Sequence, residues 1–187
     1  GAGALAQCLW EVFFEIGLLL AGDGGGSNVG RAEVPIRVEE IDELQPELLE
    51  ALVAMEQEAF GKGGMNEWFL PPFVRYGRVY VLWVANDERP AGVAECMISW
   101  QDPRCVYLFG FSIGKEWRNQ GLGTRFLQEI IRRLREQGFR ALELTVSPNN
   151  AAAVRLYQGR FGFRTIGFHK EEYGPGEDRL LLRLDLT

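Results

Sequence analysis

The sequence predicts a domain of the mixed α/β class, in which helices pack on a mostly antiparallel sheet of about seven strands. Two observations favour this class. Short apolar runs typical of strands are separated by longer segments whose apolar residues recur at helical spacing, and turn residues lie at the junctions. The chain has 187 residues, of which 47% are hydrophobic and 25% charged, so it is long enough for one domain with a sizeable core.

Charge and cysteine content exclude several functional classes. Acidic residues outnumber basic residues by 26 to 20, which gives a formal charge of -6 and no basic field to attract nucleic acid or an anionic membrane. The three cysteines, Cys8, Cys96 and Cys105, have no CxxC spacing, so neither a disulfide framework nor a zinc site is indicated. We therefore expect a cytoplasmic protein without a nucleic-acid or membrane partner.

Residues 1–30 differ from the rest and form the first of two predicted units. Residues 5–22 predict an apolar, amphipathic helix in which only Glu11 and Glu15 are charged, and residues 22–31 predict a Gly-rich linker. The uninterrupted apolar run is shorter than the roughly 20 residues of a membrane-spanning helix, and no basic residue precedes it. This unit is interpreted as an arm that packs or forms a homodimer, rather than as a signal or membrane anchor.

Residues 31–187 form the second unit, and its first half ends in three successive strands. The expected elements are a strand at 35–41, a helix at 46–60, an irregular helical piece at 66–77, and strands at 79–85, 90–100 and 105–113. Pro46 suits the first turn of its helix, whereas Pro71 and Pro72 are expected to break the helical piece. Short polar turns between the three strands indicate an antiparallel meander.

The second half continues with a helix at 121–138, a strand at 141–146, a helix at 149–161, and strands at 163–169 and 178–186. The helix at 121–138 has one apolar face and stops at Gly138. Because a helix that joins two strands of one sheet makes a crossover connection, the strands at 105–113 and 141–146 should be parallel neighbours.

Two glycines stand where this crossover helix begins. The N–H groups of a first helical turn have no intrahelical partners, and the helix dipole adds positive potential, so Gly121 and Gly123 leave a bare backbone that can bind a phosphate. Arg118 adds a cation for a charge-assisted contact. The spacing lacks the third glycine of a dinucleotide loop and the Gly-Lys-Ser/Thr of a Walker loop, so NAD and ATP are poor candidates.

The stretch around these glycines resembles a motif of the GNAT family of N-acetyltransferases. Residues 118–124, RNQGLGT, follow a strand ending in FSI and resemble the family's acyl-CoA pyrophosphate loop, (Q/R)-x-x-G-x-(G/A). Residues 150–157 and the pair Gly162-Phe163 are similar to its N-x-x-A-x-x-L-Y…G-F motif. The likeness covers residues 34–187 and implies helices on both faces of the sheet and a splayed central parallel pair. Residues 172–178 add a weaker likeness to the branch that acetylates protein N-termini, including a ribosomal-protein alanine.

The resemblance implies acetyl-CoA as co-substrate, a primary amine as acceptor and no metal. It assigns the following residues to acetyl-CoA: Phe111, Ser112 and Ile113 at the pantetheine amides, Arg118, Asn119, Gln120, Gly121, Leu122, Gly123 and Thr124 at the pyrophosphate, and Asn150 near the pantetheine arm. Tyr157 matches the family's tyrosine near the thioester sulfur. A phenol with an ordinary pKa of about 10 can protonate the departing thiolate, so Tyr157 is the expected catalytic residue, the alternative being a packing role.

The sequence departs from the family pattern at two places. They leave open which group accepts the proton of the amine and in which direction the Tyr157 side chain points. Thr145 stands where the N-terminal acetylating branch has a glutamate, and threonine cannot take up a proton there. Glu95 and Glu143 are alternatives, although each is expected to be a solvated or edge acid, and an ordered water is a further one. One extra residue between Tyr157 and Gly162 is expected to turn or bulge the end of the helix.

Several functional readings therefore remain. Acetyl transfer to a peptide N-terminus or a small amine is the first, a module that binds acyl-CoA without turnover is the alternative, and a different acyl donor such as succinyl- or propionyl-CoA is a third. The acidic charge favours a cationic or amine-bearing acceptor. Tyr173 belongs either to the acceptor entrance or to an ordinary hairpin turn.

An aromatic cluster and a single histidine are the remaining candidate site features. The aromatic cluster at 68–76 belongs either to the core or to one wall of the acceptor site; its members are Trp68, Phe69, Phe73 and Tyr76. His169 is the single histidine and has no Cys, Asp or His at ligand spacing, so no metal site is expected.

Overall fold

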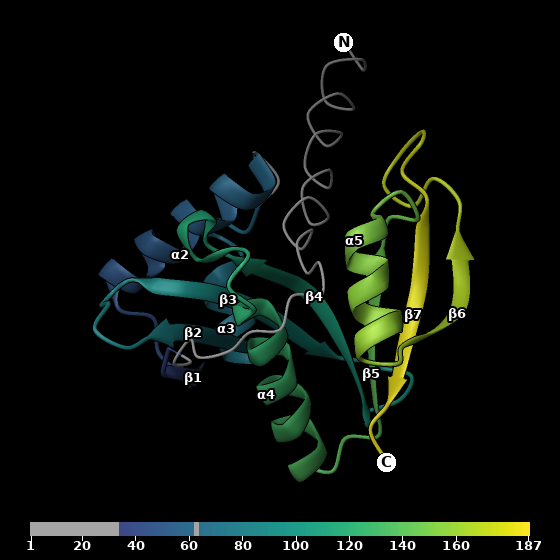
Figure 1. The fold of residues 1–187 in the computed structure, drawn as a ribbon, viewed down its shortest axis with the longest axis horizontal. Helices are drawn as coiled ribbons and strands as arrows, with labels where there is room; N and C mark the ends of the chain where they lie inside the picture. The colour runs from purple at the N-terminus through teal and green to yellow at the C-terminus, as the bar shows by residue number, and fades with distance from the viewer. Residues whose placement is uncertain (1–33, 62–63) are drawn as a thin grey trace, which may run out of the picture.

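The computed structural model describes residues 34–61 and 64–187, and these build one sheet in the strand order β1-β2-β3-β4-β5-β7-β6 (Figure 1). The strands are β1 (Ile36–Ile41), β2 (Arg78–Val84), β3 (Pro90–Ile98), β4 (Cys105–Ile113), β5 (Ala141–Val146), β6 (Arg164–His169) and β7 (Arg179–Asp185). The mixed, mostly antiparallel sheet of seven strands is thus confirmed. The expected arm and linker at residues 1–30 lie outside the described part of the chain.

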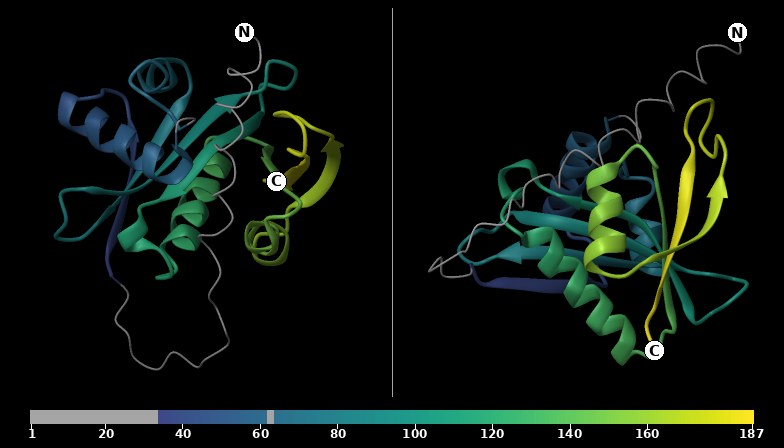
Figure 2. Two further views of the ribbon diagram at one scale, coloured as in Figure 1. Left: turned by 90° about the horizontal axis from the view of Figure 1, so that it is seen from above. Right: turned by 45° about the vertical axis from the view of Figure 1, so that its right-hand side comes forward.

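Helices cover both faces of the sheet (Figures 1 and 2). One face carries α2 (Pro46–Phe60) and α3 (Leu70–Tyr76), and the other carries α4 (Leu122–Glu136) and α5 (Ala151–Val154), which continues into η3 (Arg155–Arg160). Two buried clusters match this division. Leu52 and Leu70 pack with β2 and β3 in one cluster, and Phe126 and Leu127 pack in the other.

The helix α4 keeps the amphipathic pattern that its sequence predicts. Its apolar side chains, among them Phe126 and Leu134, are fully buried against the sheet. On the outer face Arg132 pairs with Glu129 at 2.7 Å, one turn away. After the helix, Gly138 adopts the left-handed conformation with a φ of 82°, which ends the helix as expected.

The prolines of α3 start that helix instead of breaking it, so this part of the prediction is wrong. Pro71 and Pro72 lie in the first turn, where a residue without an N–H loses no intrahelical hydrogen bond. The residues before the helix form a turn, in which the Trp68 amide donates to Asn66 Oδ1 at 2.9 Å. The segment at 66–77 is therefore a turn followed by a short helix.

The strands β4 and β5 run parallel and pair over only a short stretch. Cys105, Val106 and Tyr107 pair with residues 141–143, and no pairing follows although β4 continues to Ile113 and β5 to Val146. The two strands diverge from this point (Figure 2). The splayed central pair is confirmed, and among the described strands the second half of β4 has no pairing partner on its β5 side.

A bulge interrupts β4 just beyond this parting. Glu95 of β3 faces Gly110, but the next residue, Cys96, faces Leu108, so Phe109 is an extra residue in β4. As a result Leu108 and Phe111 both enter the cluster under α4, whereas Phe109 is 43% exposed. The bulge thereby changes which β4 side chains face each side of the sheet.

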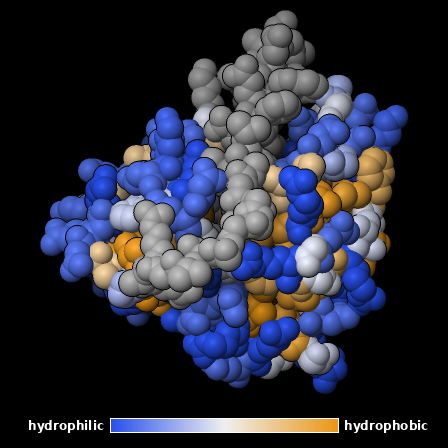
Figure 3. Space-filling view, in the orientation of Figure 1, coloured by the Kyte–Doolittle hydropathy of each residue, from blue (hydrophilic) through white to orange (hydrophobic). Residues whose placement is uncertain are grey.

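Within the described residues, the structure holds no helix that is both long and apolar enough to cross a membrane. Apolar side chains nevertheless reach the surface between α4 and α5, next to the diverging strands (Figure 3).

Candidate functional site

The loop before α4 leads into a helix whose first amides have no side-chain cap. Two residues in this loop have left-handed backbones, Asn119 with a φ of 59° and Gly121 with a φ of 74°. No side chain caps α4 at Gly121, so the amides of its first turn lack a side-chain acceptor. A Cβ built on Gly121 meets nothing within 4 Å, which shows open space beside it. This arrangement has the features of a backbone anion site at a helix start.

Side chains of the same loop fasten it to the protein. Arg118 Nε donates to the Ile113 carbonyl at 2.9 Å, and Gln120 Nε2 donates to the Glu116 carbonyl at 2.9 Å. Leu122 is buried in the core under α4. The predicted residues 118–124 are therefore contiguous in the structure: residues 118–121 form a loop held by the side chains of Arg118 and Gln120, and residues 122–124 form the first turn of α4.

The end of β4 holds the next group of predicted residues. Phe111 stacks on Phe126 of α4 with the ring centroids 5.3 Å apart, and Ile113 is buried in the same cluster. Ser112 points to the other face, where its Oγ donates to Glu56 at 3.2 Å. Their backbone lies in the unpaired half of β4, so it presents hydrogen-bonding groups towards the gap beside β5.

Asn150 stands at the start of α5. Its Oδ1 accepts a hydrogen bond from the Ala153 amide at 3.0 Å, which is the geometry of an N-cap. Asn150 also lines a cavity of about 30 Å³ together with Phe109, Thr145 and Tyr173. Asn150 therefore lies beside the end of β5, at a cavity that it shares with Tyr173 of the hairpin between β6 and β7.

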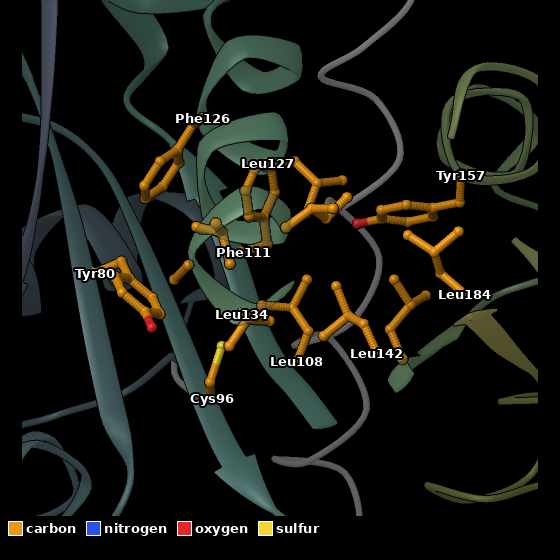
Figure 4. Close-up of a cluster of buried hydrophobic side chains, with 14 of the residues drawn as sticks. Tyr80, Cys96, Leu108, Phe111, Phe126, Leu127, Leu134, Leu142, Tyr157 and Leu184 are labelled. Atoms are coloured by element: carbon orange, nitrogen blue, oxygen red, sulfur yellow. The ribbon is translucent and has the colours of Figure 1, made fainter. Parts of the chain in front are cut away.

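Tyr157 lies in η3, where the helix widens from α to π geometry. The Phe161 amide donates to the Leu156 carbonyl, five residues earlier, at 3.2 Å. The extra residue before Gly162 is accommodated by this wider turn, as the predicted bulge anticipates. The Tyr157 ring packs edge-on against Phe163 at 5.5 Å and extends towards the group that includes Phe111 and Leu127, with its hydroxyl leading (Figure 4). Burial raises the pKa of the phenol above its usual range.

The two candidate carboxylates have environments that the sequence did not predict. Glu95 is 0% exposed, and neither of its side-chain oxygens has a hydrogen-bond partner. Burial, with the neighbouring Glu56 carboxyl, raises its pKa well above the usual value. Glu143 lies on the internal strand β5 and pairs with Arg183 at 2.7 Å. The expectation of a solvated or edge acid is wrong for Glu95, which is fully buried on the internal strand β3. Glu143 also lies on an internal strand, but its side chain is 20% exposed in the ion pair.

Thr145 has a partner across the parted strands. Its Oγ1 lies 2.9 Å from the hydroxyl of Tyr107, and either oxygen can be the donor. Burial raises the pKa of the Tyr107 phenol to about 12, so this hydroxyl stays protonated at neutral pH. The position at which the related branch has a glutamate is thus occupied by a neutral hydroxyl pair.

Sequence reasoning missed two charged residues. Glu56 on α2 is 2% exposed, although its place in an otherwise ordinary amphipathic helix gives no sign of this. Arg179 is 3% exposed, pairs with Glu177 at 2.7 Å and lies over the Tyr173 ring at 5.0 Å. A charged residue beside a run of three leucines was the available signal for Arg179.

The aromatic cluster at 68–76 lies mostly at the surface. Trp68 is 77% exposed, Phe69 57% and Tyr76 82%. Phe73 packs instead against Phe109, with ring centroids 5.3 Å apart. Because Phe109 also lines the small cavity, Phe73 and Phe109 connect α3 to the gap between the strands.

Within the described residues, no group of three or more His, Cys, Asp or Glu side chains is placed to hold a metal ion. His169 lies 3.1 Å from Glu172, close to the hairpin that carries Tyr173.

Comparisons with known proteins agree with this geometry. The model of the acetyltransferase (GNAT) family matches residues 43–163. Over 59 residues the chain is 36% identical to L-2,4-diaminobutyric acid acetyltransferase of Methylotuvimicrobium alcaliphilum, covering 32% of this chain and 34% of that one. Over 83 residues it is 30% identical to the ribosomal protein bS18-alanine N-acetyltransferase of Escherichia coli, covering 43% and 55%. The chain thus spans about a third to a half of these curated relatives.

A solved structure extends the likeness to the whole described fold. The crystal structure of the ribosomal-protein-S18-alanine N-acetyltransferase from Escherichia coli superposes with a TM-score of 0.68 at 23% identity, covering 82% of this chain and 95% of that one. The seven-stranded sheet, the parted central strands and the family match over residues 43–163 lead to one conclusion. The chain belongs to the acetyltransferase (GNAT) family.

Proposed function

We propose that the protein transfers an acetyl group from acetyl-CoA to a primary amine by direct attack of the amine on the thioester. The observation that carries this proposal is the parting of β4 from β5 directly beside the uncapped amides of α4. An extended molecule with amide groups can pair with the free edge of β4, and a phosphate can bind at the helix start. Pantetheine and pyrophosphate are joined in this order in acetyl-CoA.

Tyr157 supports the chemical step. It extends from η3 towards Phe111, one of the residues at the free edge of β4 (Figure 4). As the amine nitrogen forms a bond to the acyl carbon, the carbon–sulfur bond breaks and the thiolate takes the Tyr157 proton. Burial raises the pKa of the phenol, so Tyr157 carries its proton when the substrates bind.

The acceptor is proposed to enter from the side of Tyr173 and Phe109. Both residues line the small cavity with Thr145, and the Arg179 guanidinium packs on the face of the Tyr173 ring. The relatives described above act, by their names, on a ribosomal-protein alanine or on L-2,4-diaminobutyric acid. Because these names describe transfer, they support an enzyme rather than a module that only binds acyl-CoA.

Thiol release from acetyl-CoA tests the proposed function. We expect release that depends on an added amine, measured with an alanine-initiated peptide, with 2,4-diaminobutyrate and with the same compounds N-acetylated as controls. Mass spectrometry should show the acetyl group on the amine. Acetyl-CoA binding without release in the presence of any of the free amines would contradict transfer and favour the binding module.

The phosphate cradle leads to a first mutational prediction. Gly121→Val is expected to weaken acetyl-CoA binding by roughly tenfold or more, because a branched side chain at a φ of 74° is strained and crowds the amides. Calorimetry measures the affinity. Gly138→Val is the matched control, since Gly138 has a φ of 82° and equally open space at the other end of α4. Equal affinity loss in both variants would show an effect on the helix rather than on the cradle.

The acceptor entrance leads to a second prediction. Tyr173→Ala should raise the KM for a peptide acceptor severalfold and leave the KM for acetyl-CoA nearly unchanged, because Tyr173 lines the cavity beside Thr145. Trp100→Ala is the control, because Trp100 is 95% exposed in the turn between β3 and β4. An unchanged peptide KM in the Tyr173 variant would assign the residue to an ordinary hairpin.

A further inference from the structure

Glu95 is a buried polar group that the fold alone does not explain. Its carboxyl is 0% exposed, and neither oxygen has a hydrogen-bond partner. Leaving such a group unpaired in a protein interior costs free energy, so it calls for a ligand or a chemical role. Glu143, the other acid near the parted strands, is already engaged by Arg183 and needs no such explanation.

The β4 bulge makes room for this carboxyl. Glu95 faces Gly110 across the two strands, and a Cβ built on Gly110 would lie 2.3 Å from Glu95 Oε2. The Glu95 carboxyl therefore occupies the place that a side chain at position 110 would take. Any side chain at position 110 would have to displace the Glu95 carboxyl, whereas glycine leaves it in place.

The same position is where the acyl group arrives if the proposed function holds. With the phosphates at residues 118–124 and the pantetheine along residues 113–111, the arm runs backwards along β4. Its thioester end then reaches Phe109 and Gly110, at the bulge. Phe109 also lines the cavity assigned to the acceptor, and Gly110, the next residue, is the one that faces Glu95 across the strands.

A second carboxyl approaches from α2. Glu56 is 2% exposed and accepts hydrogen bonds from the Met65 amide at 3.1 Å and from Ser112 Oγ at 3.2 Å. Burial raises its pKa to about 7, and its charge also raises the pKa of Glu95. From β2, the residue opposite Glu95 is the apolar Val79. Two acids in one dry site cannot both ionise easily, so the pair changes its proton content near neutral pH.

We propose that Glu56 and Glu95 form a carboxyl pair that takes up the proton of the attacking amine, directly or through one water. The inference rests on the proposed function and supplies the proton acceptor that Thr145 cannot provide. On attack, the N–C bond forms and the nitrogen loses one proton to the pair, while the thiolate takes one proton from Tyr157. Solvent then carries a proton from the pair back to the Tyr157 phenolate, so protons balance over one turnover.

The test compares Glu95→Gln and Glu56→Gln with the wild type between pH 6 and pH 9.5. We expect turnover at pH 7 to fall by roughly 100- to 10,000-fold in each variant, with acetyl-CoA affinity by calorimetry within about twofold of wild type. The deficit should shrink as the pH rises, because hydroxide can then take the proton. Wild-type turnover should decline below about pH 7, as Glu56 becomes protonated. Glu136→Gln, which neutralises an exposed acid on the outer face of α4, is the control with nearly wild-type turnover.

Gly110→Ala provides a variant that keeps both charges. The new methyl group displaces the Glu95 carboxyl, and we expect a loss of turnover with retained acetyl-CoA affinity. If Glu95→Gln fails to fold, this variant and Glu56→Gln carry the test. Wild-type rates and pH profiles in the folded variants would overturn the pair, and so would a loss of equal size at every pH, which indicates a structural role. A wild type that transfers no acetyl group would instead overturn the proposed function, and the inference with it.

Discussion

Tyr157→Phe is expected to lower turnover by roughly ten- to ten-thousand-fold with little change in acetyl-CoA affinity. The substitution removes the phenol proton and keeps the ring that packs on Phe163. Without that proton the thiolate must leave unprotonated or wait for water, so kcat falls while binding at the loop before α4 continues. Steady-state kinetics for kcat and calorimetry for affinity separate the two effects.

Tyr80→Phe is the matched control for this experiment. Tyr80 is a fully buried tyrosine of the same core cluster, on β2, and lies away from the gap between β4 and β5 (Figure 4). Turnover in this variant should stay near that of the wild type. Unchanged turnover in Tyr157→Phe would leave Tyr157 with only a packing role.

Glu95→Gln is expected to stabilise the fold at alkaline pH. In the native state burial keeps the Glu95 carboxyl protonated, whereas the unfolded chain ionises it above its ordinary pKa of 4.5. The unfolded state then binds fewer protons, so wild-type stability falls with rising pH by about 1.4 kcal/mol for each pH unit that this group governs. Glutamine does not titrate, so the variant should be more stable by about 2 kcal/mol or more at pH 8.

Denaturant unfolding at pH 5 and pH 8 measures this difference. At pH 5 the two proteins should differ much less in free energy of unfolding than at pH 8, because pH 5 is only about half a unit above the ordinary pKa of 4.5. Glu143→Gln should go the other way and lose stability, since it removes the partner of Arg183. A constant gap between wild type and Glu95→Gln at both pH values would mean that Glu95 is ionised in the native state. A stabilised but slower Glu95→Gln enzyme would show that the chain gives up stability for function.

The order of strands and helices could be predicted because it depends on local patterns. The apolar face of α4 and the glycines at its start are visible within about 20 residues, and the crossover rule then makes β4 and β5 parallel. The π turn at Tyr157 was anticipated from one extra residue, because an insertion in a packed helix must widen it or bend it.

The surroundings of the acids could not be predicted, because they depend on the register of distant strands. In the sequence Glu95 looks like an ordinary acid of a strand. Only the structure shows that the bulge in β4 places Gly110 opposite it. Glu56 comes within reach of Ser112 only when α2 packs on β4, and the two residues are 56 positions apart in sequence. The prolines of α3 were misread for a simpler reason, since the same residue type starts a helix or breaks it according to its position.

Three residue pairs are all that join β4 to β5, and they divide the sheet into two mechanical halves. One half contains β1 to β4 with α2 and α3, and the other contains β5 to β7 with α5. A ligand bound between the halves would contact both of them. It would form hydrogen bonds with β4 where β5 forms none, and would thereby connect the two halves. Substrate binding is then expected to reinforce the weakest join of the sheet, which couples substrate binding to the rigidity of the protein.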